Sequence, residues 1–228
     1  METVCKSPLL ANAASQLMGI PRVRLYQDSL FVKRYQDGKT PWHIDARMSP
    51  FDTQHFITFW IPLHDIPAKG TGLVFVSKSH SDMALPYWNE ADVSKEYSRL
   101  EERYGVTDDD DTAIQHYMPM RTGDVTVHSG WTLHCADANQ SIDGSGQSRC
   151  DRYALAVSYV DARAEVREDV LESINRLTEG GRQGDAGSSN YRGDDEDTSS
   201  FLPWIRDVKP RSQFNHNLVP LVWPTQSS

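Results

Sequence analysis

Hydrophobic residues along the chain fall mostly into short runs with the composition of β-strands. In these runs aromatic and β-branched residues recur, and turn residues such as Gly70 and Gly72 separate them. The expected strands cover residues 23–35, 55–66, 72–80, 116–120, 124–135 and 152–160. The run 55–66 is almost continuously apolar, which predicts a strand that is covered on both faces. Many short strands with few helices indicate a mainly β fold, a sandwich or barrel with helical decoration.

Helical patterns are fewer and lie outside these runs. A short helix is expected over residues 8–18, a charged surface helix over 88–104, and a further helix over 167–177. Residues 178–200 contain almost no large apolar side chains, so burial cannot offset the entropy of ordering them. We expect this segment to be a flexible insertion in a single domain that spans residues 1–228.

Composition limits the possible partners and the compartment. The 228 residues include 23 Lys and Arg against 32 Asp and Glu, a formal charge of −9, which argues against nucleic acid or an anionic membrane as a partner. Three scattered cysteines are too few for a disulfide framework or a cysteine-type zinc site. No basic leader precedes a long apolar run at the start of the sequence. A cytoplasmic protein is therefore expected.

A histidine and an aspartate, His43 and Asp45, stand two positions apart in an extended-looking segment. Alternate side chains of a strand share a face, so these two would project together. A second histidine from a distant strand would complete a set of two histidines and one carboxylate, which suits non-haem Fe(II). The pattern alone is weak evidence, because residues 80–82 repeat it. His128 and His134 both compete to be the third ligand, and strand alternation does not choose between them.

An arginine, Arg152, begins the apolar run "RYALAVSYV". If it faces inward, it needs an anionic partner, and its planar guanidinium can grip a carboxylate through two parallel hydrogen bonds. The simpler interpretation is a strand-end residue in solvent. Arg149, in the polar stretch just before it, is a second candidate for the same role.

Taken together, three segments resemble the phytanoyl-CoA dioxygenase family. They are "WHIDARMSPFDTQHFITFWIPLHDIPAKGTGLVFVSKSH", "GDVTVHSGWTLHCADAN" and "RYALAVSYV", in the family's order. The similarity covers roughly residues 20–165. It implies a double-stranded β-helix, the jelly-roll or cupin-like fold, and an enzyme that depends on Fe(II), 2-oxoglutarate and O2.

The resemblance also assigns roles to individual residues. His43, Asp45 and His134 match the iron ligands of the family. Arg152 matches the arginine that holds the far carboxylate of 2-oxoglutarate, and Trp60 matches a tryptophan beside this cosubstrate. On this assignment His128 is a bystander. One departure is the 18-residue spacing between His134 and Arg152, which is longer than usual in the family.

The function that follows is an Fe(II)- and 2-oxoglutarate-dependent dioxygenase. It would hydroxylate or otherwise oxidise a small organic substrate, with release of succinate and CO2. One alternative is a catalytically inactive metal-binding or scaffold protein with the same fold. Another is a zinc hydrolase that uses the same three ligands, although no catalytic glutamate motif accompanies them. The sequence leaves the substrate open, whether a CoA thioester or a free small molecule, and also the oligomeric state.

Overall fold

The computed structural model describes most of the chain apart from three internal stretches and a few positions near the C-terminus. The described residues are 1–81, 114–140, 150–168, 170, 201–205, 208–209, 211–213 and 215–224. They fall into two units. Unit 1 comprises Met1–Gln27, Ala46–Phe56 and Tyr159–Ser228, and unit 2 comprises Asp28–Asp45 and Ile57–Ser158. Three of the four boundaries, at residues 27/28, 56/57 and 158/159, lie within continuous strands, and the expectation of one domain over residues 1–228 stays a prediction.

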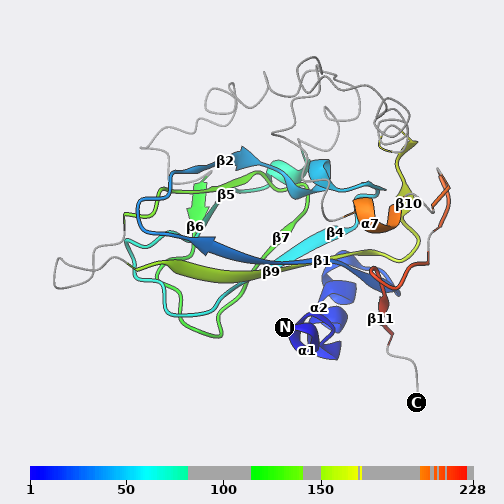
Figure 1. Cartoon of the computed structure of the whole chain (residues 1–228), viewed down its shortest axis with the longest axis horizontal. Coiled ribbons are helices and arrows are strands. Elements are labelled where there is room, and N and C mark those ends of the chain that lie inside the picture. Colours follow the sequence, from blue (N-terminus) through cyan, green and yellow to red (C-terminus); the bar gives the residue numbers. More distant parts are fainter. Residues whose placement is uncertain are drawn as a thin grey trace. The chain divides into compact units, whose positions relative to one another are not determined.

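The described strands form antiparallel ladders between segments that are distant in sequence (Figure 1). One five-stranded sheet has the order β11-β1-β9-β4-β7, and a four-stranded sheet, entirely within unit 2, has the order β2-β8-β5-β6. A two-stranded ladder joins β3 and β10 in unit 1. The bounds are Val23–Lys33 (β1), Thr40–His43 (β2), Phe51–Asp52 (β3), Phe56–Pro62 (β4), Leu73–Val76 (β5), Ile114–His116 (β6), Thr126–Ser129 (β7), His134–Ala136 (β8), Arg152–Asp161 (β9), Glu165–Val166 (β10) and Leu221–Trp223 (β11).

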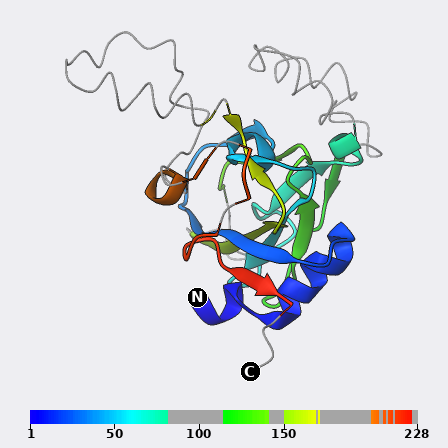
Figure 2. The ribbon, with the colours of Figure 1, turned by 90° about the vertical axis from the view of Figure 1, so that its right-hand side faces the viewer.

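Unit 1 contains the described helices α1 (Glu2–Cys5), α2 (Pro8–Met18) and α7 (Leu202–Ile205). The helix expected over residues 8–18 is confirmed. Pro8 occupies its first turn, where a missing N–H costs nothing, and Gly19 ends it in the left-handed conformation with φ of 67°. Helix α2 packs against β11, as Figure 2 also shows. In the core of this unit the buried rings of Phe51 and Trp204 stack with their centroids 5.7 Å apart.

Unit 2 has its own buried cluster, formed by Trp60, Ile66, Met120, Ala154 and Ala156. Strand β4 is buried along almost its whole length, as the apolar run 55–66 predicted. In the ladder between β4 and β7, Thr58 pairs with His128 and Trp60 pairs with Thr126. Paired residues of an antiparallel ladder project to the same face, so these four side chains form two adjacent rows on one side of the sheet.

Three strand predictions were wrong in extent. The strand expected over residues 72–80 is limited to Leu73–Val76, and a turn follows it. The expected strand over residues 124–135 is two strands, β7 and β8, in different sheets. The chain turns between them, where the backbone N–H of Thr132 donates to the carbonyl of Ser129 and the N–H of Trp131 donates to the Ser129 hydroxyl. The strand expected over 116–120 ends at His116, shortly before Pro119, which has no N–H to donate to a ladder.

Several expectations lie outside the described residues, namely the helix over 88–104, the insertion over 178–200 and nearly all of the helix over 167–177. None of the helices in the described ranges is long and apolar enough to span a membrane.

Candidate metal and cosubstrate site

His43 is the last residue of β2, and Asp45 begins the 3₁₀ turn η1 (Asp45–Met48). The sequence pattern predicted that the two residues share a strand face, and this was wrong. The turn nevertheless brings their side chains together. The Nδ1 of His43 lies 2.8 Å from the carbonyl oxygen of Pro41, so this nitrogen donates and Nε2 keeps its lone pair. That Nε2 atom lies 3.8 Å from Oδ1 of Asp45.

The third member of the cluster is His134, the first residue of β8 and the register partner of His43. Its Nδ1 lies 3.0 Å from the carbonyl oxygen of Thr132, and its Nε2 lies 3.5 Å from Oδ1 of Asp45. One ligand atom each from His43, Asp45 and His134 can be chosen so that all lie within 4.8 Å of one another. Between the two histidines that the sequence left open, His134 is the one that joins this group.

The charges of the group suit a divalent cation. Burial alone would raise the pKa of the Asp45 carboxyl, but the adjacent His134, the hydrogen bond from His128 and the other histidine hold that pKa well below its ordinary value. Burial, only partly opposed by Asp45, lowers the pKa of His134 to about 3. At neutral pH the cluster thus presents an anionic Asp45 carboxylate and a neutral His134 imidazole. This donor set fits Fe(II), which prefers imidazole and carboxylate ligands and must displace protons from any that are protonated.

Two residues beside Asp45 were missed as members of the site. The hydroxyl of Thr58 donates to Oδ2 of Asp45 at 2.8 Å, and Nε2 of His128 lies 3.2 Å from the same oxygen. The Thr58 hydroxyl is also 3.0 Å from that of Ser158. His128 is therefore not a bystander bonded to backbone, because its ring contacts the carboxylate. The signal that connects it with Thr58 is their pairing between β4 and β7, which the linear sequence does not contain.

Arg152 begins β9 and is 6% exposed, so the prediction of a buried arginine holds and the solvent-exposed alternative does not. Its guanidinium carbon lies 5.2 Å from the ring centroid of Trp60, which is itself buried. Burial lowers the pKa of Arg152 to about 10, so it is still charged at neutral pH. Among the described residues its Nε has no hydrogen-bond partner, and no carboxylate pairs with the side chain. Arg149 lies outside the described residues.

A buried, unpaired cation is costly unless an anion reaches it. The far carboxylate of 2-oxoglutarate has the charge and the planar geometry that a guanidinium binds. The orphaned Nε of Arg152 therefore fits this cosubstrate, as the donor set at Asp45 fits the metal.

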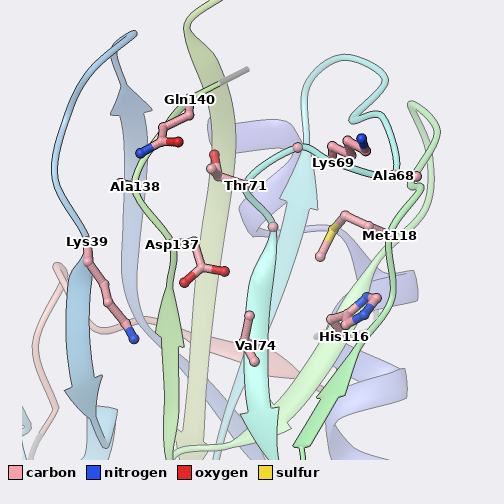
Figure 3. A pocket seen from close by; sticks show the side chains of 12 residues that line it. Lys39, Ala68, Lys69, Thr71, Val74, His116, Met118, Asp137, Ala138 and Gln140 are labelled. Carbon is pink, nitrogen blue, oxygen red and sulfur yellow. The ribbon is translucent and has the colours of Figure 1, made fainter. Parts of the chain in front are cut away.

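A cavity of about 520 Å³ lies elsewhere in unit 2 (Figure 3). Lys39, Asp137 and Gln140 line one side, Lys69 and Met118 line the other, and Thr71 and Val74 lie between them. None of the five predicted site residues lines this cavity. It is therefore distinct from the metal cluster.

A mainly β fold with this cluster is typical of non-haem iron enzymes that use 2-oxoglutarate. The family model for phytanoyl-CoA dioxygenase (PhyH) matches residues 1–145, more than half of the chain. The chain therefore belongs to the phytanoyl-CoA dioxygenase family. It is a non-haem iron, 2-oxoglutarate-dependent enzyme with O2 as the oxidant, as the sequence resemblance implied, and the scaffold and zinc hydrolase alternatives are set aside.

Solved structures share the fold. The epimerase SnoN from nogalamycin biosynthesis is 21% identical with a TM-score of 0.61, over 97% of this chain and 72% of its own. The carbocyclase SnoK from the same biosynthesis is 21% identical with a TM-score of 0.64, over 96% of this chain and 70% of its own. EctD from S. alaskensis is 16% identical with a TM-score of 0.52, over 71% and 53%. The predicted mainly β fold with few helices is confirmed, and it is consistent with the jelly-roll fold of these structures. No curated protein matches the chain.

Proposed function

We propose that the protein hydroxylates or otherwise oxidises a small organic substrate while converting 2-oxoglutarate and O2 into succinate and CO2. In this proposal His43, Asp45 and His134 hold Fe(II), and Arg152, packed on Trp60, holds the far carboxylate of the cosubstrate. The observation that carries it is the grouping of three ligand atoms within 4.8 Å in the same unit as a buried arginine that lacks a carboxylate partner among the described residues.

Each residue contributes a defined interaction. Bound iron, 2-oxoglutarate and O2 supply the oxidising chemistry, in which one oxygen atom enters succinate and the other enters the substrate in a hydroxylation. Asp45 contributes the single negative charge of the ligand set. His43 and His134 present Nε2 because their Nδ1 atoms bond to backbone carbonyls, which fixes the orientation of both rings. Arg152 positions the cosubstrate by its distal end, so that the keto-acid end is directed toward the metal.

We propose an oxidation without specifying its type, because the structures that share the fold have names for different reactions. Two of them are named an epimerase and a carbocyclase, and a SnoN structure contains Fe3+, α-ketoglutarate and nogalamycin RO. These names support small organic molecules as the substrate class. The net charge of −9 supports a small molecule rather than nucleic acid or a membrane. The sequence has only three scattered cysteines, which supports a cytoplasmic location.

The test is a cosubstrate-binding experiment without oxygen. Fe(II) and then 2-oxoglutarate are added to the purified protein, and the weak visible charge-transfer band of the iron chelate is recorded. We expect the band in the wild type and in His116→Ala, a matched control because His116 is exposed and outside the cluster. We expect no band in His134→Ala, and in Arg152→Ala a band only at much higher 2-oxoglutarate. Absence of the band in the wild type would overturn the proposal.

The same protein is then exposed to air with candidate substrates. We expect succinate to form in proportion to the 2-oxoglutarate consumed, and a true substrate to accelerate that consumption. If 2-oxoglutarate binds but no substrate or uncoupled reaction yields succinate, the proposed reaction is wrong although the cosubstrate site is correct.

A further inference from the structure

The two carboxylate oxygens of Asp45 have different surroundings. Oδ1 lies near Nε2 of His43 and of His134, at 3.8 and 3.5 Å. Oδ2 contacts the Thr58 hydroxyl and Nε2 of His128, at 2.8 and 3.2 Å. A carboxylate oxygen accepts about two strong hydrogen bonds, one for each lone pair. The hydrogen-bonding capacity of Oδ2 is therefore used by the protein, whereas Oδ1 faces the two histidines of the metal cluster.

The donors to Oδ2 are fixed by the sheet. Thr58 on β4 and His128 on β7 are register partners, so their side chains project together from one face. Both are buried, with exposed fractions of 3% and 5%. The hydroxyl of Thr58 donates its one hydrogen bond to Asp45. The hydroxyl of Ser158, 3.0 Å away on β9, therefore donates to the oxygen of Thr58. A chain of donors thus runs from Ser158 through Thr58 to Asp45.

The orientation of His128 is consistent with a donor role. Its Nε2 faces a carboxylate oxygen, which can only accept, so Nε2 carries the proton. Its Nδ1 is buried and has no hydrogen-bond partner among the described residues. A proton there would be unsatisfied, so a single tautomer is favoured. The ring also packs against Phe75, with centroids 5.2 Å apart, which restricts its rotation.

We propose that Thr58 and His128 are positioning residues that restrict Asp45 to binding iron through Oδ1 alone. This inference rests on the proposed function. With two histidines and one carboxylate oxygen, the protein would fill three positions of an octahedral Fe(II) and leave the others for the cosubstrate and O2. Binding through Oδ2 as well would take one of those positions.

The test uses Co(II) as the metal, added to the whole protein without oxygen, with affinity and the visible spectrum as readouts. Thr58→Val and His128→Leu remove the donors at similar volume. Thr58→Ser and His128→Gln keep a donor at a similar reach and serve as matched controls. Loss of partners that orient metal ligands typically weakens metal binding about 10- to 100-fold. We expect that loss in the first pair, and affinities within a few-fold of wild type in the second.

The spectrum distinguishes positioning from general damage. In an octahedral ion a second oxygen of Asp45 would take the place of a water and distort the site, so the visible Co(II) bands of the donor-free variants should shift, while those of Thr58→Ser and His128→Gln stay at the wild-type positions. Circular dichroism and thermal melting identify any variant that fails to fold. If His128→Leu fails to fold, the test uses Thr58→Val. Unchanged affinity and spectrum in the folded donor-free variants would overturn the inference, as would equal losses in both pairs. A wild type that binds no Co(II) would instead overturn the proposed function.

Discussion

Two buried arginines, one in each unit, have opposite surroundings. Arg24 in unit 1 donates to the carbonyl of Val219 at 2.8 Å and contacts the side-chain oxygen of Asn215. Arg152 in unit 2 is just as buried but stacks on Trp60 and finds no hydrogen-bond acceptor among the described residues. Arg24 ties strand β1 to the C-terminal segment. Arg152 has hydrogen-bonding groups left for a partner that the described residues do not supply.

Other buried polar groups follow the same division. In unit 1 the Asp161 carboxylate is paired with Arg163 at 2.9 Å, a structural ion pair. In unit 2 the Asp45 carboxylate faces three histidines, and no lysine or arginine among the described residues pairs with it. Asp161 thus has a permanent cation beside it, whereas Asp45 lies among imidazoles that can share a metal ion with it.

Exchanging each arginine for methionine tests most directly whether Arg24 and Arg152 have different roles. For Arg152→Met we expect unchanged or slightly higher thermal stability, because an unpaired buried charge is removed. We also expect 2-oxoglutarate affinity to fall by about 2–5 kcal/mol, roughly 30- to 5,000-fold, since the bound carboxylate loses its buried partner. Arg24→Met should do the reverse, with stability lower by about 1–3 kcal/mol and cosubstrate affinity unchanged.

Thermal melts and titrations of the iron–2-oxoglutarate band measure both quantities for both variants. Arg152→Lys is a useful intermediate, because an ammonium keeps the charge but not the two parallel hydrogen bonds. If Arg152→Met unfolds the protein or leaves 2-oxoglutarate affinity intact, Arg152 is a structural arginine like Arg24 and the contrast disappears.

The pH dependence of stability distinguishes His134 in unit 2 from Asp161 in unit 1. Burial holds the pKa of His134 at about 3, whereas in the unfolded chain it is near its ordinary value of 6.5. Between these values the unfolded state binds the extra proton, so the free energy of unfolding rises with pH, by up to about 1.4 kcal/mol per pH unit. Burial raises the pKa of Asp161, but Arg163 outweighs burial and holds this pKa below 3.8. The contribution of Asp161 to the free energy of unfolding is therefore lost only at a pH below that value.

Urea unfolding of the metal-free protein between pH 4.5 and 7 measures this slope. We expect a shallower slope for His134→Gln, which has no group that titrates at this position. His116→Gln is the control, because it makes the same substitution at an exposed position outside the cluster. Equal slopes in all three proteins would mean that His134 is not kept neutral by the fold.

The sequence predicts the members of the cluster better than their surroundings. His43 and Asp45 were recognisable by their spacing of two residues, and Arg152 by its place at the start of an apolar run. Even so, the local structure at Asp45 was predicted wrongly, because the alternation of a strand does not indicate where the chain turns into η1. Likewise, the hydrophobic pattern over residues 124–135 looks continuous, although the chain turns after Ser129 and changes sheets.

Thr58, His128 and Ser158 could not be assigned from the sequence for a different reason. Their relation to Asp45 depends on the register between β4 and β7 and on the neighbouring strand β9. Register is set by packing over whole strands, and a shift of one residue would turn every side chain to the other face. A resemblance between motifs carries the ligands across but says little about groups that act only through such pairings.

The contact between Arg152 and Trp60 should have a smaller effect on 2-oxoglutarate affinity than the charge of Arg152 itself. Its guanidinium lies 5.2 Å from the centroid of the Trp60 ring, and a buried contact of this kind contributes about 1–2 kcal/mol. We therefore expect Trp60→Leu to weaken 2-oxoglutarate binding about 5- to 30-fold, and Trp60→Phe, which keeps an aromatic face, to change it less than about threefold. Both variants shrink a core residue, so thermal melts are needed to separate packing from orientation. If the two variants bind 2-oxoglutarate equally well, Trp60 is only a core aromatic, and the orientation of Arg152 depends on its strand alone.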